Sequence, residues 1–475
     1  MKNNEKALIN VSKKTFIQVT VLLLSLMIAA IVLTYIIPRG QFGTLENGET
    51  NYLDYSRTED GSGINILKGI FAPVLVFTSS DGITLIMLSL FLLVISAAFQ
   101  VMNDAGGISA LIGYVSERFR NRKTLLIIAV AFVFMCFGAF LGLFEEMLTM
   151  LPIVTTLCVF IGFDSFTGFL ISIIACGFGF ASAITNPFTV ILASQIIKTN
   201  PMEHVWYRFV IFFVMFLLLL GFIFLYIRKI KKDPGSSLTF ARDERLRADL
   251  SAPDAGPAPD GVKKTRIVYT VFLLLSLVLI IVASSVAALR GYTVVILLAY
   301  FLILGPVAGI ICTSKPGAVF KSFLKGLLGA LPTLVFIALA SSIKYIFEEG
   351  SIMPTIIHGI NEFAEGKNVF VVALVIYAVV LVLEFFISSS TAKAVLVMGI
   401  LSVVNVGLTK QMSVLLYTFA DGYTNVLFPT SPVLLISLSM IGLDYFKWVK
   451  KSLPLFIVNL ALVLAFIVLG IVIGY

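Results

Sequence analysis

Charged residues are scarce in this chain. Of its 475 residues, 13% are Asp, Glu, Lys or Arg, whereas 59% are hydrophobic. Soluble domains carry roughly 25% charged residues. The shortage excludes a soluble domain of any size and indicates a protein that lies in a membrane along most of its length. The net charge of +8 is concentrated in loops, where it sets orientation, and does not indicate a nucleic-acid partner.

Residues that commonly hold metals or act in catalysis are also few. The chain has two histidines and four cysteines, and no two cysteines have CxxC spacing. Walker A, GxSxG and HExxH sequences are absent. We therefore expect no enzyme activity and no cofactor, and we interpret the cysteines as small core residues.

Long apolar runs dominate what is present. An apolar run of about 20 residues is long enough to cross a membrane. Nine segments are predicted to span it: 15–37, 82–103, 166–198, 205–228, 266–289, 293–313, 328–347, 411–441 and 452–474. The basic N-terminus resembles a signal peptide, but the first run is too long for one and is expected to be an uncleaved span. Trp206 and Trp448 are expected to anchor span ends at the membrane interface.

Two further apolar segments, 123–163 and 369–407, are about 40 residues long and polar at their centres. Each is too long for one crossing and lacks a hydrophilic loop for two. A re-entrant hairpin fits, because non-helical backbone is tolerated at membrane depth where it lines a cavity. The predicted fold class is an all-α polytopic membrane protein with about nine transmembrane helices, two re-entrant hairpins and two broken helices.

The basic loops favour this topology. If 123–163 returns to the side it came from, the cluster Arg228, Lys229, Lys231 and Lys232 lies in the cytoplasm, as the positive-inside rule requires. The N-terminus is then cytoplasmic and the C-terminus extracellular. The hairpin 123–163 opens to the cytoplasm, and 369–407 opens to the outside.

The same order of segments occurs twice. In each copy a span is followed by an amphipathic arm, a hairpin, a broken span and a last span. Because the copies have opposite orientation, the sequence predicts an inverted-topology repeat, as in many transporters. We assign 1–228 to the first repeat, 229–265 to a flexible cytoplasmic linker, and 266–475 to the second repeat.

Polar breaks interrupt the spans 166–198 and 411–441. The first reads Thr185-Asn186-Pro187, and the second includes Asp421, Thr424-Asn425, Pro429, Thr430 and Ser431. Proline removes a backbone donor, and the start of the following half-helix favours anions. The breaks therefore predict a binding site. The alternative, proline kinks that only shape packing, is less favoured because the break occurs at matching places in both repeats.

The hairpin tips differ in charge. Ser388, Ser389, Ser390 and Thr391 form a neutral, donor-rich tip suited to a carboxylate, and Lys393 beside it could pair with a substrate or with Glu384. Glu145 and Glu146 form an acidic tip that could bind Na⁺, carry a proton or face a substrate ammonium group. Alternatively, they pair with Lys344 or Lys393 for structure alone.

These stretches resemble the YfcC-like, C4-dicarboxylate anaerobic carrier family of the ion transporter superfamily. The resemblance rests on sequences that span nearly the whole chain outside the linker: Thr34–Phe42, Phe144-Glu145-Glu146, Thr185–Phe188, Phe419–Asn425, Phe428–Ser431 and Lys447-Trp448. It implies a two-hairpin fold of inverted repeats, often dimeric, with a scaffold and a mobile transport part. It also implies ion-coupled movement of small organic acids or amino acids. The tip at Ser388–Thr391 departs from the Pro-Ser-Gly-Ser-Gly-like tip typical of the family.

The leading hypothesis is a secondary transporter of a small carboxylate-bearing metabolite, such as a C4-dicarboxylate, working by alternating access. The substrate-binding prediction comprises Ser388, Ser389, Ser390, Thr391, Thr185, Asn186, Thr424, Asn425, Thr430 and Ser431. The coupling-ion prediction comprises Glu145, Glu146, Asp421 and Ser182, for Na⁺ or H⁺, with Na⁺ also considered at Asn186 and Asn425. The alternative is a transporter or exchanger of basic or zwitterionic amino acids; an ion channel is less favoured, because two opposed blind hairpins leave no continuous pore. The expected partners are the substrate, membrane lipid and, from the resemblance, a second copy of the chain.

Overall fold

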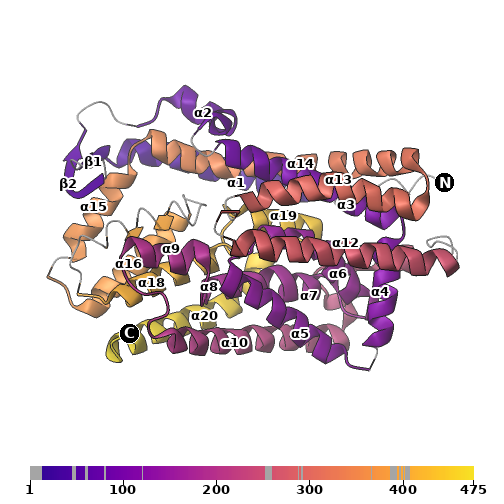
Figure 1. The fold of residues 1–475 in the computed structure, drawn as a ribbon. Helices are drawn as coiled ribbons and strands as arrows, with labels where there is room; N and C mark the ends of the chain where they lie inside the picture. Colours follow the sequence, from indigo (N-terminus) through magenta and orange to yellow (C-terminus); the bar gives the residue numbers. More distant parts are fainter. Residues whose placement is uncertain are drawn as a thin grey trace.

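The computed structural model consists mainly of long helices (Figure 1). It describes residues 13–44, 50–58, 63–79, 82–119, 121–251, 259–286, 288–289, 292–364, 366–385, 393–394, 397–398, 401 and 407–475.

Eight helices in the described part of the chain are long and apolar enough to cross a membrane: Val19–Ile36, Gly82–Asp104, Lys123–Leu141, Val205–Lys232, Gly261–Ala283, Thr293–Thr313, Pro316–Glu349 and Tyr445–Val472. Seven of them coincide with the seven unbroken spans expected from the sequence. The eighth, Lys123–Leu141, is the first arm of the segment predicted to be a hairpin. The structure therefore confirms a helical, multi-pass architecture.

One layer of the molecule, near the top of Figure 1, is formed by α1, α2, α3, α13 and α14. α3 packs against α13 and α14, and α14 also packs against α1 and α2. The bounds of these helices are α1 (Lys13–Ile36), α2 (Ile66–Leu75), α3 (Gly82–Asp104), α13 (Thr293–Thr313) and α14 (Pro316–Glu349).

The second layer holds both interrupted helices and the segment 123–163, which the sequence predicts to be re-entrant and which we call the first hairpin. Its elements are α5 (Lys123–Cys136), η2 (Phe137–Leu141), η3 (Glu146–Thr149), α6 (Leu151–Phe160), α7 (Ser165–Phe169), η4 (Leu170–Ile174), α8 (Ala175–Ala181), η5 (Pro187–Ile191), α9 (Leu192–Ile196), α10 (Val205–Lys232), α16 (Val369–Glu384), α18 (Lys410–Thr424), α19 (Pro432–Met440) and α20 (Tyr445–Val472). α8 and α18 lie against each other near its centre. α4 (Gly107–Arg118) and α12 (Pro259–Ser285) lie between the layers, since α12 contacts both α13 and α4.

Helices at matching places in the two predicted copies run antiparallel. Ser96 of α3 donates a hydrogen bond to the Gly326 carbonyl of α14, whereas Asp104, further along α3, accepts one from Ser322, earlier in α14. α10 and α20 show the same relation, because Tyr207 lies on Phe466 and Tyr226 lies near Lys451. This geometry is the one an inverted repeat requires, while the assigned repeat boundaries stay a prediction.

Polar side chains set the starts of several helices. Asp164, Asn186, Thr409, Ser431 and Asp444 each accept a hydrogen bond from a backbone N–H in the first turn that follows. Such caps satisfy donors that the helix itself leaves without partners. In an apolar chain, these caps determine where each helix begins.

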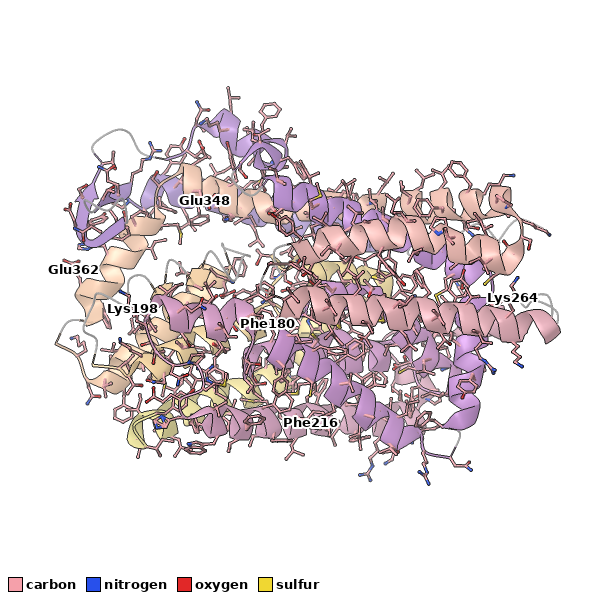
Figure 2. All side chains as sticks on the ribbon, in the orientation of Figure 1. Phe180, Lys198, Phe216, Lys264, Glu348 and Glu362 are labelled. Atoms are coloured by element: carbon pink, nitrogen blue, oxygen red, sulfur yellow. The ribbon has the colours of Figure 1, made fainter. Side chains whose placement is uncertain are left out.

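The structure departs from the all-α prediction at one place. The loop between the first two spans contains an antiparallel pair of strands, β1 (Gly40–Thr44) and β2 (Thr50–Arg57). Tyr55 hydrogen-bonds Thr355 at 2.8 Å and stacks on His358, both in α15 (Met353–Ala364). Thr50 and Tyr55 are residue types that favour strands. The contact with α15 fixes the strand pair at the end of the molecule where Glu362 lies, opposite to Lys264 (Figure 2).

The predicted flexible linker is partly ordered. η6 (Pro234–Ser236) and α11 (Phe240–Ser251) lie within it. Asp243 is 1% exposed and accepts hydrogen bonds from the backbone N–H and hydroxyl of Ser165 and from Thr239, while Asp164 accepts bonds from Tyr226 and Ser237. Helices therefore lie within the predicted linker at 234–236 and 240–251, where polar residues bind the start of α7, while the assignment of 229–265 as a linker stays a prediction.

Burial raises the pKa of the Asp243 carboxyl, although the hydrogen bonds from Ser165 and Thr239 and the nearby Arg242 oppose that shift. Arg242 in turn donates to the Ser165 hydroxyl at 2.7 Å, and Arg247 donates to the Phe163 carbonyl at 2.7 Å. α11 is thus attached by several charge-assisted bonds.

Trp448 was expected at the membrane interface, and that prediction is wrong. Its side chain is fully buried, lies edge-on to Phe169, and donates from Nε1 to the Val426 carbonyl at 3.1 Å. Trp206, in contrast, is 55% exposed. A buried tryptophan needs a partner for its N–H, and the second break supplies it.

Candidate functional site

The first break is closed by its own asparagine. α8 ends at Ala181, and Asn186 begins the next half-helix. Asn186 is fully buried; its Oδ1 accepts from the N–H groups of Phe188 and Thr189 at 2.9 and 3.3 Å, and its Nδ2 donates to the Gly138 carbonyl at 3.3 Å. The first free donors of this half-helix are therefore already satisfied by the protein.

The first hairpin rests directly on this break. The N–H groups of Ile184 and Thr185 donate to the Ala139 carbonyl at 2.9 and 3.1 Å, and the Thr185 hydroxyl donates to the Phe140 carbonyl at 3.1 Å. Gly142 adopts φ +67°, and a Cβ there would lie 2.4 Å from the Asn186 Oδ1. Only glycine tolerates both the positive φ and this close approach. Because of these contacts and the hydrogen bonds above, we treat the first hairpin and the first break as one unit.

The acidic tip lies in this unit and has no ion pair to a basic side chain in the part of the chain that the structure describes. Glu146 begins η3 and is 8% exposed, whereas Glu145 is exposed. Within the described part of the chain no ion pair joins either carboxylate to Lys344 or Lys393. Lys344 pairs instead with Glu348 at 3.3 Å, and Lys393 pairs with other carboxylates. The alternative of a structural pairing with these two lysines is therefore not supported.

The second break is wider than the first. α18 ends at Thr424 and α19 begins at Pro432. Asn425 Nδ2 donates to the Asp421 carbonyl at 2.8 Å, which continues the preceding helix rather than capping the next one. The Ser431 hydroxyl caps α19 through a long 3.4 Å bond from the Leu434 N–H. Thr430 and Ser431 are each 6% exposed, at the start of α19.

An ionic cluster lies beside the second break. The Lys393 ammonium group contacts Glu384 and Asp421, the latter at 2.6 Å, and all three side chains are buried. The Thr424 hydroxyl lies 3.1 Å from the same Glu384 oxygen that contacts Lys393. We call Glu384, Lys393, Asp421 and Thr424 the ionic cluster.

The sequence suggests the Glu384–Lys393 pair but not the cluster. Glu384 and Lys393 stand nine positions apart in one apolar run, where charges are costly and usually functional. Asp421 joins them from another helix, which spacing alone does not reveal. Glu384 is absent from the predicted site residues, although its position in an apolar run was the signal available.

The two broken spans cross at their breaks. A Cβ at Gly422 would lie 2.0 Å from the Ala181 Cα, and one at Gly177 would lie 2.2 Å from the Val426 Cγ1. Phe144, next to the acidic tip, also approaches Gly177. The structure therefore brings the acidic tip, both breaks and the ionic cluster together at the centre of the second layer.

Several predicted site residues take up local roles here. Ser182 donates to the Phe178 carbonyl at 2.6 Å, at the end of α8, and Thr424 donates to backbone carbonyls of α18 as well as to Glu384. The predicted tip Ser388, Ser389, Ser390 and Thr391 lies outside the described residues.

The geometry around the breaks determines whether a metal ion could bind there. Among the described residues, no group of three or more His, Cys, Asp or Glu side chains is arranged to hold a metal ion. The Asn186 oxygen already accepts two N–H groups, so Na⁺ at Asn186 would compete with a helix cap.

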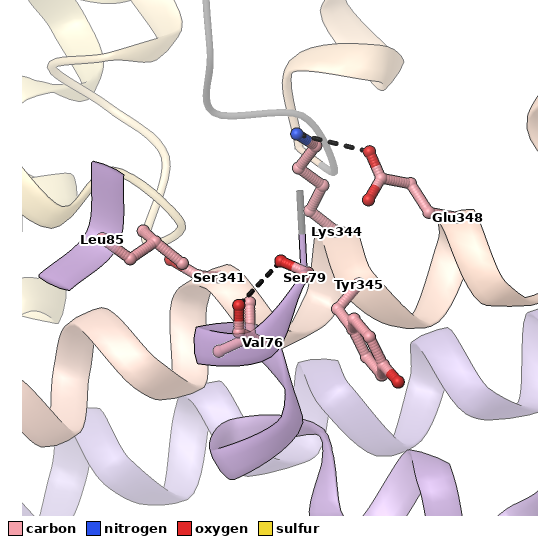
Figure 3. Close-up of a pocket in the computed structure, with 7 residues that line it drawn as sticks. All are labelled: Val76, Ser79, Leu85, Ser341, Lys344, Tyr345 and Glu348. Carbon is pink, nitrogen blue, oxygen red and sulfur yellow. Dashed lines mark hydrogen bonds and ion pairs between the residues drawn. The ribbon is translucent and has the colours of Figure 1, made fainter. Parts of the chain in front are cut away.

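A small pocket of about 20 Å³ lies elsewhere, between η1 (Val76–Thr78), α3 and α14. Figure 3 shows Lys344 reaching Glu348 above Ser341 and Tyr345. Its volume is below the roughly 300–1,000 Å³ of ordinary ligand pockets, and it contains neither break. We therefore place the candidate site at the breaks.

Comparison with known proteins agrees with these features. The family model described as C4-dicarboxylate anaerobic carrier matches residues 16–472. A protein of Escherichia coli strain K12 named "Putative basic amino acid antiporter YfcC" is 27% identical over 390 residues, covering 78% of this chain and 75% of that one. An uncharacterized protein of Haemophilus influenzae strain Rd is 23% identical over 368 residues, covering 77% and 71%.

Among solved structures, the YdaH transporter of Alcanivorax borkumensis aligns with a TM-score of 0.42 at 16% identity, over 96% of this chain and 99% of that one. MtrF of Neisseria gonorrhoeae aligns with a TM-score of 0.42 at 15% identity, over 94% of each chain.

Proposed function

Because the chain belongs to the C4-dicarboxylate anaerobic carrier family, and is thus a multi-pass secondary transporter and not an enzyme, we propose that it exchanges small basic amino acids by alternating access. The substrate would bind between the two breaks, with its cationic groups toward the carboxylates there. The solute class is the finer part of this proposal and rests on charge.

The charge balance at the breaks carries the proposal. Among the described residues at the breaks and beside the hairpin tips, the carboxylates are Glu145, Glu146, Glu384 and Asp421, and the only cation is Lys393. Lys393 already pairs with two of these carboxylates. A substrate carboxylate would therefore meet excess negative charge, whereas an ammonium or guanidinium group would relieve it.

The carboxylate end of an amino acid also needs a partner. The start of α19, with Thr430 and Ser431, is the better candidate, because its cap is long, whereas Asn186 closes the other half-helix. Helix N-termini favour anions through free N–H groups and the helix dipole. The name of the Escherichia coli relative agrees with a basic amino acid as cargo.

A C4-dicarboxylate is the second candidate, and the description of the family favours it. It was the leading hypothesis from the sequence. It requires that Glu145 and Glu146 be protonated or cation-bound while the dicarboxylate is present, since like charges repel strongly in low dielectric.

Coupling and assembly complete the proposal. H⁺ or Na⁺ would couple through the carboxylates at the breaks, with Glu145, Glu146 and Asp421 as the sequence-derived candidates and Na⁺ also considered at Asn186 and Asn425. We further propose a cytoplasmic N-terminus, an extracellular C-terminus and a homodimer in the cell membrane.

The test is counterflow in proteoliposomes that contain the purified full chain. Vesicles loaded with arginine, ornithine, lysine, succinate or citrate are diluted into labelled arginine or labelled succinate, with and without Na⁺ and a pH gradient. We expect saturable arginine or ornithine exchange and little succinate exchange. Succinate counterflow without arginine counterflow would establish the second candidate, and unitary currents without counterflow would indicate a channel.

A further inference from the structure

The ionic cluster holds more negative than positive charge in a fully buried place. Lys393 is 0% exposed, Asp421 is 0% exposed and Glu384 is 4% exposed. With both carboxylates ionised, the cluster would carry one uncompensated negative charge. A buried charge without a compensating partner is strongly unfavourable, so a further positive charge would stabilise the cluster.

The two oxygens of Glu384 differ in their surroundings. Oε2 contacts the Lys393 ammonium group and the Thr424 hydroxyl, whereas Oε1 is buried and has no hydrogen-bond partner among the described residues. A buried acceptor without a partner is rare and calls for an explanation. A proton on this carboxyl removes the excess charge with the geometry as it stands.

The groups that act on Glu384 are limited. From the stretch at 393–394 comes Lys393, and from α18 come Asp421 and Tyr417. α15 and α20 also contact α16, and their titratable residues include His358, Glu362, Lys450 and Lys451. None of these acts on Glu384 among the described residues. Among the described residues, the charged groups that act on Glu384 are therefore members of the ionic cluster itself.

We propose that Glu384 carries a proton that is exchanged for the cationic substrate during transport. On deprotonation, the O–H bond of Glu384 breaks, the electron pair stays on the carboxylate and the proton passes to water. The cluster then has one net negative charge, which an ammonium or guanidinium group of the substrate neutralises. Proton and substrate thus neutralise the same charge in turn, which makes their binding mutually exclusive and the transport an antiport.

This assignment differs from the carboxylates at the acidic tip. Glu145 and Glu146 belong to the first hairpin, and they lie outside the ion pairs of Lys393. Mutation of the two sites therefore separates them. The exchange with substrate rests on the proposed function, but the protonation of Glu384 in the substrate-free protein does not.

Infrared spectroscopy of the purified, substrate-free chain tests the protonation. A protonated carboxyl has a C=O stretching band distinct from that of a carboxylate. We expect Glu384→Gln to remove one such band at neutral pH, and Glu349→Gln, which alters an exposed pair with Lys68 at 2.6 Å, to leave it. An unchanged band in Glu384→Gln overturns the proposal. Because an amide mimics the neutral acid, failure of Glu384→Gln to fold overturns it as well.

Proton release on substrate binding tests the exchange. In weakly buffered solution, addition of the exchanged substrate to the wild-type chain should release about one proton per molecule bound. We expect near-zero release from Glu384→Gln and an exchange rate that no longer changes with pH, while Glu349→Gln behaves as wild type. If proton release persists in Glu384→Gln, or is lost only in Glu146→Gln, the exchanged proton does not lie on Glu384. Absence of any exchanged substrate for the wild type would count against the proposed function, while the infrared result still decides protonation.

Discussion

The two breaks occupy matching places in the predicted repeats but are stabilised by different forces. The first is neutral: Asn186 caps its own half-helix and binds the first hairpin through Gly138. The second is ionic: Lys393, Glu384 and Asp421 meet beside it. The first break is held by uncharged groups, whose charge does not change with pH. The carboxylates of the second break bind or release protons, so the net charge there changes with pH. We infer that the first break holds the hairpin in position and that the second carries the coupling.

The largest effect is expected from removing the cation of the second break. Lys393→Met leaves Glu384 and Asp421 buried without a positive partner, which costs about 3–5 kcal/mol for a broken buried pair. Thermal melting of the detergent-purified protein should show a strong loss of stability. Lys68→Met, which removes an exposed pair, is the control and should melt as wild type. If Lys393→Met and the wild type had the same melting temperature, the ion pairs of Lys393 would not stabilise the second break.

The crossing of the two broken spans should be the next most sensitive place. Gly422→Ala places a methyl group 2.0 Å from the Ala181 Cα, and overpacking of this kind costs about 1–3 kcal/mol. Transport and melting temperature should both fall. Gly221→Ala in α10 is the matched control, since nothing lies within 4 Å of its added Cβ. If both variants behaved alike, the breaks would not touch as described.

A smaller effect distinguishes the two asparagines. Asn186→Ala removes a helix cap and should cost about 0.5–2 kcal/mol of stability, together with transport. Asn425→Ala removes one bond within α18 and leaves the start of α19 unchanged, so melting should shift less than for Asn186→Ala while substrate affinity weakens. Melting curves and half-saturation of exchange, measured on the same preparations, give both quantities. A reversed order of the two melting shifts would contradict the neutral role of the first break.

The smallest effect is expected far from either break, at α11. The pKa of Asp243 is raised by burial, so the folded state binds more protons there than the unfolded state at a pH above the usual value of 3.8. Stability of the docked helix should therefore rise as the pH falls through the raised pKa toward 3.8. Hydrogen exchange of 240–248, corrected for intrinsic rates, should slow on mild acidification in wild type and lose this dependence in Asp243→Asn. If hydrogen-exchange protection were independent of pH in both the wild type and Asp243→Asn, Asp243 would not link the docking of α11 to pH.

Sequence reasoning succeeds where the signal is local. Apolar runs predict the unbroken spans, and an asparagine followed by a proline within a few residues predicts both breaks. Each of these signals depends on neighbouring residues alone. It fails where partners come from distant segments. Asp421 pairs with Lys393, which lies in a different segment of the chain. Trp448 is buried, and its Nε1 donates to the Val426 carbonyl. The strands β1 and β2 were missed because their stability depends on α15, some 300 positions away in the sequence.

The docking of α11 has a practical consequence for dividing the molecule. Arg242, Asp243 and Arg247 all bind residues 163–165, which belong to the N-terminal half. A protein expressed as two separate polypeptides should therefore be cut after Ser251 and before Pro259, so that the first fragment retains the segment that completes it. A cut near Lys232 would remove these hydrogen-bond partners from the start of α7 and leave its polar groups without them.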